Sequence, residues 1–201
     1  MTVSISRRDL LKHAVRGGAT LAITGSSVGA LAGAASASAP PTGDLAYVRL
    51  LVGAELLASD FYSQAIAASN SSAAVMKYLK LAYFNEQQHY QSVAGILSGS
   101  LVTPAISSDF TFSYPDGTFA TEGSIVKFAA QLEGTVLGAY LGAIGAIQTQ
   151  AWVGGLAQIA ANEGQHLSYF QGVAGSRTFG LSFPPALDIE DASNAFAAYT
   201  A

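Results

Sequence analysis

The chain contains no cysteine, and this absence excludes several kinds of structure and chemistry. Disulfides, thiolate metal sites, a cysteine nucleophile and a lipid anchor on cysteine all require that residue. Charge is also scarce, because only 11% of the 201 residues are charged while 50% are hydrophobic. A chain of this length and composition suits one compact domain with a sizeable core.

Basic residues are few, and some of them lie in a segment typical of a targeting signal. Residues 6–12, SRRDLLK, are similar to a twin-arginine export signal, in which Leu often replaces Phe. A weakly hydrophobic stretch at about 17–34 and a small-x-small pattern at 35–37 follow, and together they predict a signal peptide at residues 1–37. The alternative is an uncleaved membrane anchor, which the Gly and Ser content disfavours. We therefore expect export to the periplasm, cell envelope or exterior, without stable membrane insertion.

The expected mature chain is acidic. Removal of residues 1–37 takes away four of the 9 basic and one of the 13 acidic residues, which leaves 5 basic and 12 acidic residues and a net charge of −7. Nucleic-acid binding needs a basic face, so no nucleic-acid partner is expected. Any chemistry must come from a small number of polar residues within apolar segments.

Hydrophobic periodicity predicts four helices after a linker at residues 38–43. Asp44 follows a glycine and is expected to be the N-cap of the first helix. A tail at residues 175–201 contains a candidate short helix from about Asp188. The four helices are expected at about 44–69, 72–97, 121–148 and 151–174.

The connection between the second and third helices, residues 99–120, is long and contains two prolines and a Pro-Asp-Gly turn. A helix of about 26 residues is ~39 Å long, and 22 extended residues span ~70 Å. The connection can therefore return along the whole bundle. The expected fold is all-α, a four-helix bundle over residues 44–174 with one long crossover between the second and third helices.

Two short polar stretches interrupt the apolar helices, NEQQH at 85–89 and NEGQH at 162–166. Apart from His13, in the predicted signal peptide, they contain every histidine of the chain. Each Glu and His continues a spacing of four and three residues set by apolar neighbours, which runs from Val75 to Ile96 and from Trp152 to Val173. This spacing places one row of side chains toward the bundle core, so the Glu and His side chains are predicted to point inward.

The two halves of the bundle have matching sequences. Glu55 and Tyr62 in the first helix have the same spacing as Glu133 and Tyr140 in the third. Each half is thus a helix with one inward Glu, followed by a helix with Glu-x-x-His. We interpret this as a duplicated helical hairpin.

These residue types at these positions favour a metal site. Glu and His at i and i+3 lie about 60° apart on a helix, so both can bind one ion. Four carboxylates in an empty core would repel one another and be costly to desolvate, whereas two divalent cations would balance them. The alternative is that the groups satisfy one another, with some carboxylates protonated. The six predicted metal ligands are Glu55, Glu86, His89, Glu133, Glu163 and His166.

Through these six residues and their spacing, the sequence resembles the ferritin-like di-iron carboxylate superfamily over about 44–174. There, one Glu from each of two helices joins a Glu-x-x-His from each of the other two. LLVGAELLASDFY and NEQQHY are similar to a branch of exported ferritin-like proteins that includes desiccation-related members. The resemblance implies two iron ions, or manganese, that react with O2 or H2O2 in a ferroxidase or peroxide-consuming enzyme. Substrate oxygenation and a non-catalytic, metal-stabilised stress-protective protein are the alternatives.

Other polar residues have less specific interpretations. Tyr62 and Tyr140 can hydrogen-bond ligands or donate electrons, but ordinary core aromatics are the favoured interpretation. Gln88 and Gln165 each precede a predicted ligand His and contact either the ligands or a neighbouring helix. Glu122, near the start of the third helix, is expected to interact with the helix dipole. Asp60 is expected to be solvated.

Overall fold

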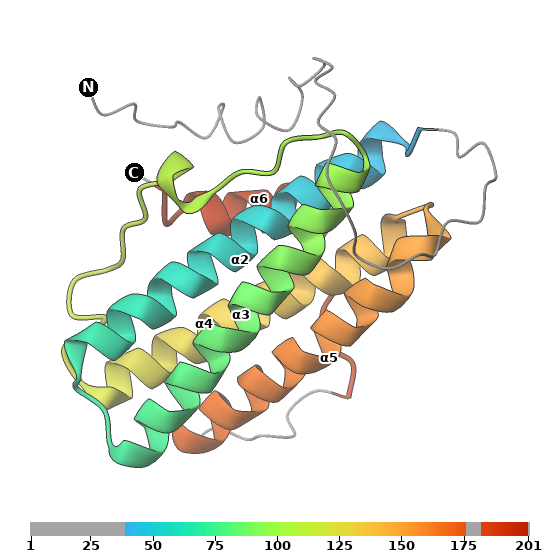
Figure 1. Cartoon of the computed structure of the whole chain (residues 1–201). Helices are drawn as coiled ribbons and strands as arrows, with labels where there is room; N and C mark the ends of the chain where they lie inside the picture. Colours follow the sequence, from blue (N-terminus) through green and yellow to red (C-terminus); the bar gives the residue numbers. More distant parts are fainter. Residues whose placement is uncertain (1–38, 176–181, 201) are drawn as a thin grey trace.

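The computed structural model describes residues 39–175 and 182–200, and this part of the chain is built from helices. The predicted signal peptide lies outside the described residues. Four long helices lie side by side as a bundle (Figure 1), which confirms the predicted all-α fold. The elements are α2 (Thr42–Ala68), α3 (Ala73–Gly99), η1 (Ser107–Asp109), α4 (Glu122–Ala146), α5 (Gln150–Val173) and α6 (Ile189–Ala197).

The bundle consists of two hairpins, in which α2 packs along α3 and α4 packs along α5. Between the hairpins, α2 contacts α4 and α3 contacts α5. The connection from α3 to α4 includes η1 and runs along the length of the bundle, as Figure 1 shows. The predicted crossover between the second and third long helices is therefore confirmed.

Local sequence explains where the hairpin helices end and begin. The backbone of Ser69 is left-handed, with φ of 54°, and ends α2. The side chain of Ser72 then accepts a hydrogen bond from the Val75 amide and caps α3. Thr121 and Ser124 form a reciprocal capping box at the start of α4.

The two predicted inward rows are correct in their central parts. The row on α3 is buried from Val75 to Val93, and the row on α5 is buried from Leu156 to Phe170. Val173 was wrongly predicted to be inward, because 42% of its surface is exposed. It is the last residue of α5.

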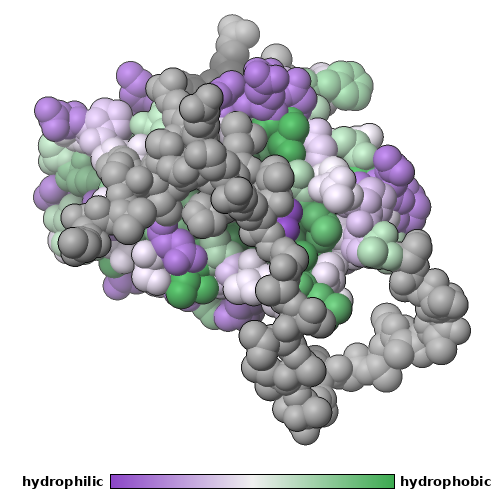
Figure 2. All heavy atoms as spheres, turned by 90° about the horizontal axis from the view of Figure 1, so that it is seen from above, coloured by the Kyte–Doolittle hydropathy of each residue, from purple (hydrophilic) through white to green (hydrophobic). Residues whose placement is uncertain are grey.

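In the view of Figure 2, hydrophilic and hydrophobic residues are interspersed over the described surface that is visible. Within residues 39–175 and 182–200, no helix combines the length and the hydropathy needed to cross a membrane.

Asp44 was wrongly predicted to be the N-cap of the first helix. That position is occupied by Pro41, and Asp44 lies in the first turn with 2% of its surface exposed. Its carboxylate accepts hydrogen bonds from the amides of Gln148 and Thr149 and from the Thr149 hydroxyl, at 2.6–3.1 Å. Burial would raise the pKa of Asp44, but these hydrogen bonds outweigh burial and hold the pKa below its usual value. Asp44 thus fixes the turn between α4 and α5.

Asp44→Ala should lower the free energy of unfolding by about 1–3 kcal/mol, because three buried or half-buried donors lose their acceptor. The pKa of Asp44 is lower in the folded chain than its model value of 3.8. The stabilisation is therefore present above pH 3.8 and is lost as the pH falls through the folded-state pKa. Urea unfolding at pH 7 and at acid pH measures both effects. Asp116→Ala, in an exposed turn, is the matched control, and equal losses in the two variants would contradict the assignment.

The C-terminal segment packs across α2 and α4. The Leu187 amide donates to the Gly138 carbonyl at 2.9 Å. Asp188 caps α6 by accepting from the amides of Glu190 and Asp191. Beyond α6, Thr200 pairs with Phe112 of the crossover in an isolated antiparallel bridge. The tail and the crossover therefore support each other on one side of the bundle.

Candidate metal centre

All six predicted ligands lie together in the core of the bundle. The four glutamates have no exposed surface, His166 is 1% exposed and His89 is 8% exposed. Each long helix contributes to the cluster because the polar residues take core positions of the helical repeat. The contributing residues are Glu55 of α2, Glu86 and His89 of α3, Glu133 of α4, and Glu163 and His166 of α5.

The cluster divides into two overlapping groups of four residues. Glu86 and Glu163 belong to both groups. Glu55 and His89 complete one group, and Glu133 and His166 complete the other. Within each group the candidate ligand atoms all lie within 4.8 Å of one another, so each group could hold a metal ion.

Each histidine is nearest to a glutamate of the opposite hairpin. Nδ1 of His89 lies 2.8 Å from Oε1 of Glu163 and 3.4 Å from Oε2 of Glu86. Nδ1 of His166 lies 2.9 Å from Oε1 of Glu86 and 3.3 Å from Oε2 of Glu163. The two shared carboxylates are thus placed between the two imidazoles.

These short distances do not have the geometry of hydrogen bonds. Among the described residues, nine buried side-chain nitrogen or oxygen atoms have no hydrogen-bond partner, and all but the Ser71 hydroxyl belong to the cluster. Buried polar atoms are seldom left unsatisfied, because each one costs free energy. The chemistry of the donor set therefore fits a cation. The eight cluster atoms are Oε2 of Glu55 and Glu133, both oxygens of Glu86 and Glu163, and Nδ1 of His89 and His166.

Electrostatics describe the cluster without a cation, when the histidines would be charged and paired with the glutamates. Burial opposes the charge, but the neighbouring glutamates raise the pKa of His89 to about 12 and raise the pKa of His166 as well. Burial raises the pKa of Glu55 and raises the pKa of Glu86 well above its usual value. Burial, with a contribution from the Glu163 charge, raises the pKa of Glu133 to about 8. Without a cation the cluster would therefore take up protons, and a bound cation would release them.

Two tyrosines hydrogen-bond the cluster from opposite hairpins. The Tyr62 hydroxyl of α2 donates to Oε1 of Glu133 on α4, and the Tyr140 hydroxyl of α4 donates to Oε1 of Glu55 on α2. Both tyrosines are fully buried. Burial, followed by the nearby glutamate charges, raises the pKa of each tyrosine well above its usual value, so the hydroxyls stay protonated as donors. The favoured interpretation as ordinary core aromatics was incomplete, because both residues hold ligand side chains in place.

Asn85 was missed in the sequence analysis. Nδ2 of its side-chain amide lies 3.1 Å from Nε2 of His166. In this orientation the amide donates to Nε2. Were Nδ1 of His166 to bind a cation, Nε2 would carry the proton and the Asn85 amide would turn to accept it through its oxygen. Such a bond fixes the tautomer and the orientation of a ligating imidazole. The repeated Asn before each Glu-x-x-His was the available signal, since Asn85 precedes Glu86 as Asn162 precedes Glu163.

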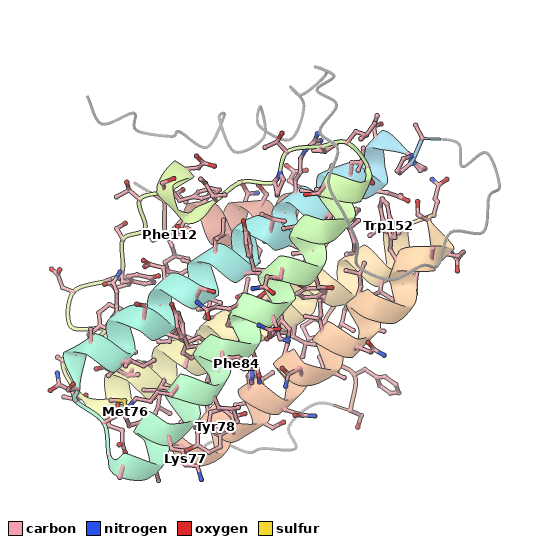
Figure 3. All side chains as sticks on the ribbon, in the orientation of Figure 1. Met76, Lys77, Tyr78, Phe84, Phe112 and Trp152 are labelled. Carbon is pink, nitrogen blue, oxygen red and sulfur yellow. The ribbon has the colours of Figure 1, made fainter. Side chains whose placement is uncertain are left out.

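The two halves match in their candidate ligands but differ in the side chains around them. Asn162 donates to Gln165 at 3.3 Å instead of holding a histidine. Tyr78 lies between α3 and α5 (Figure 3), and its ring meets that of His166 edge to face at 6.1 Å. His166 is therefore held and enclosed, whereas His89 is nearer the surface.

The remaining candidates lie outside the cluster. Gln88 and Gln165 are exposed, and among the described residues no hydrogen bond joins either of them to a cluster residue. Glu122 is the first residue of α4, where an acidic side chain suits the helix dipole. Its carboxylate also accepts the Ser72 amide and so links the starts of α3 and α4.

The fold and the cluster define the class of protein: a helical bundle with a buried carboxylate and histidine cluster that could bind metal. The model of the family described as "Ferritin-like domain" matches residues 43–176. The chain therefore belongs to the ferritin-like domain family, which confirms the superfamily resemblance. No curated protein matched the chain.

Proposed function

We propose that the cluster binds two metal ions, iron or manganese, and that the protein is a ferroxidase or consumes peroxide. The eight unsatisfied buried atoms in two overlapping groups carry this proposal. Two divalent cations would balance the four carboxylates and satisfy those atoms. Mixed oxygen and nitrogen donors suit iron and manganese. Export through the signal at residues 6–12 is part of the proposal and rests on the sequence alone.

The side chains have separate tasks in this proposal. Glu86 and Glu163 face both groups and would hold the two ions together. Tyr62 and Tyr140 each occupy one oxygen of a glutamate and leave the other free to bind. Asn85 keeps Nδ1 of His166 turned to the cluster. The apolar core around the cluster excludes bulk water, which strengthens every one of these interactions.

The bound pair would supply two electrons, one from each Fe(II), which together with two protons reduce H2O2 to two water molecules. The chain's own residues do not change oxidation state in this balance. Carboxylates that release protons on binding a cation are the nearest groups able to return them.

The test is the rate at which Fe(II) is lost. Protein loaded with Fe(II) without oxygen should lose Fe(II) to O2 or H2O2 faster than free Fe(II) in the same buffer, measured with a colorimetric Fe(II) chelator after unfolding. His166→Ala and His89→Ala should both slow the reaction, whereas Glu122→Ala, which changes the start of α4 outside the cluster, should not. A rate no faster than that of buffer, together with no O2 release from peroxide by the manganese form, would favour the non-catalytic protective alternative.

A further inference from the structure

A second site lies on the outer side of the first hairpin, under the crossover. This pocket has a volume of about 460 Å³ and is lined by α2, α3 and the segment around η1. Sites for small molecules have volumes of roughly 300–1,000 Å³. Leu56 lines the pocket while its neighbour Glu55 points into the core, and neighbouring residues of a helix are about 100° apart, so the pocket and the metal cluster are on different faces of α2.

Asp60, which was predicted to be solvated, lies in this pocket. It is half-buried, and its Oδ2 accepts hydrogen bonds from the Gln64 amide at 2.7 Å and the Tyr114 hydroxyl at 2.8 Å. Among the described residues no donor reaches Oδ1. The crossover covers this part of α2, and its path was not readable from the sequence around Asp60.

The walls of the pocket are fixed before any ligand binds. The Tyr90 hydroxyl donates to the Ala105 carbonyl at 2.9 Å and ties the crossover to α3. The Tyr114 hydroxyl also contacts the Leu57 carbonyl at 3.3 Å and ties the crossover to α2. Phe110 and Phe112 stack at 5.4 Å, and Phe112 (Figure 3) is in addition bridged to the C-terminal segment. A preformed site costs little ordering on binding.

Among the described residues, the lining has one carboxylate, four aromatic rings and no basic side chain. The rings belong to Tyr83, Tyr90, Phe110 and Phe112, and the carboxylate is Asp60. An anion would be repelled by Asp60, and a purely apolar ligand would leave Oδ1 without a partner. Aromatic rings attract organic cations, and a carboxylate beside them supplies the counter-charge. We propose that this pocket binds a small organic cation, an alkylammonium or quaternary ammonium compound.

The experiment uses the full metal-loaded chain and three probes: choline, tetraethylammonium and putrescine. Titration calorimetry measures the affinity of the chain for each probe. At least one probe should bind with one site per chain, and acetate should not bind. Asp60→Asn should weaken binding at least tenfold, because the side chain keeps an acceptor for Tyr114 but loses its charge. Asp116→Asn, an exposed turn residue outside the pocket, should bind as the unchanged chain does. Phe110→Leu should also weaken binding while it preserves an apolar wall, and it covers the case in which Asp60→Asn does not fold.

Three outcomes would overturn the proposal. The first is that none of the cations binds. The second is that the affinity is unchanged in Asp60→Asn or, should that variant not fold, in Phe110→Leu. The third is that a neutral disaccharide binds in place of the cations, with the same affinity for Asp60→Asn as for the unchanged chain. That result would make the pocket a site for polyhydroxylated ligands. Metal content should be the same in all variants, so that failure here is distinguishable from failure of the metal-centre proposal.

Discussion

Replacing Glu86 and Glu163 together by leucine should abolish metal binding and raise the stability of the metal-free protein. The two glutamates belong to both four-residue groups, so both candidate sites lose half of their ligands at once. All four of their oxygens are buried without a hydrogen-bond partner, and leucine removes that cost. Exchanging buried ionisable groups for apolar ones of similar volume often stabilises a protein by about 1–4 kcal/mol.

The order of stability should reverse when metal is present. An ion at 100 times its dissociation constant stabilises the native state by about 2.7 kcal/mol per site. Metal-loaded wild type should therefore melt above the double variant, and metal-free wild type should melt below it. Thermal melts with and without a chelator, combined with elemental analysis, measure both effects. Glu122→Ala should keep all of its metal. A metal-free double variant less stable than wild type would favour the alternative in which the buried groups satisfy one another.

Gly142→Ala should destabilise the protein by about 3 kcal/mol. A Cβ atom at this position of α4 would lie 1.7 Å from the backbone oxygen of Leu187, so the tail must move away from the helix. Overpacking usually costs about 1–3 kcal/mol, and a collision with backbone belongs at the upper end of that range. The hydrogen bond from Leu187 to Gly138, one turn earlier, would be strained as well.

Gly155→Ala is the matched control for this substitution. Gly155 is an exposed residue of α5, and a Cβ atom there has no neighbour within 4 Å. Alanine should therefore stabilise the helix by about 0.5–1 kcal/mol. Urea unfolding gives both values, and limited proteolysis of the Gly142→Ala variant should cleave the tail faster than in wild type. A Gly142→Ala protein as stable and as resistant as wild type would contradict the observed path of the tail.

The sequence was sufficient for features that depend on one helix at a time. Glu86, His89, Glu163 and His166 were found because each continues the apolar repeat of its own helix, and this repeat fixes which side chains face the core. The matching offsets of Glu55 and Glu133 added the other two members of the cluster. The long crossover followed from chain length and helix length alone.

Features that depend on contacts between distant segments were missed. Asp44 resembled an N-cap because nothing in its neighbourhood shows that the turn at 148–149 will pass beside it. Asp60 resembled a solvated residue for the same reason. The helical glycines of α4 look alike in the sequence. Only at Gly142, however, would an added Cβ atom lie less than 2 Å from the backbone of another segment. The repeat also hid a difference between the halves, since Asn85 reaches a histidine and Asn162 does not.

Anomalous X-ray diffraction at the iron edge, on crystals of the iron-loaded protein, tests the central claim most directly. The claim is that the buried cluster is a dinuclear metal site. The expected result is two anomalous peaks per chain, one among Glu55, Glu86, His89 and Glu163 and the other among Glu86, Glu133, Glu163 and His166. Crystals in which the cluster contains no peak, or in which iron binds only elsewhere on the chain, would contradict the claim.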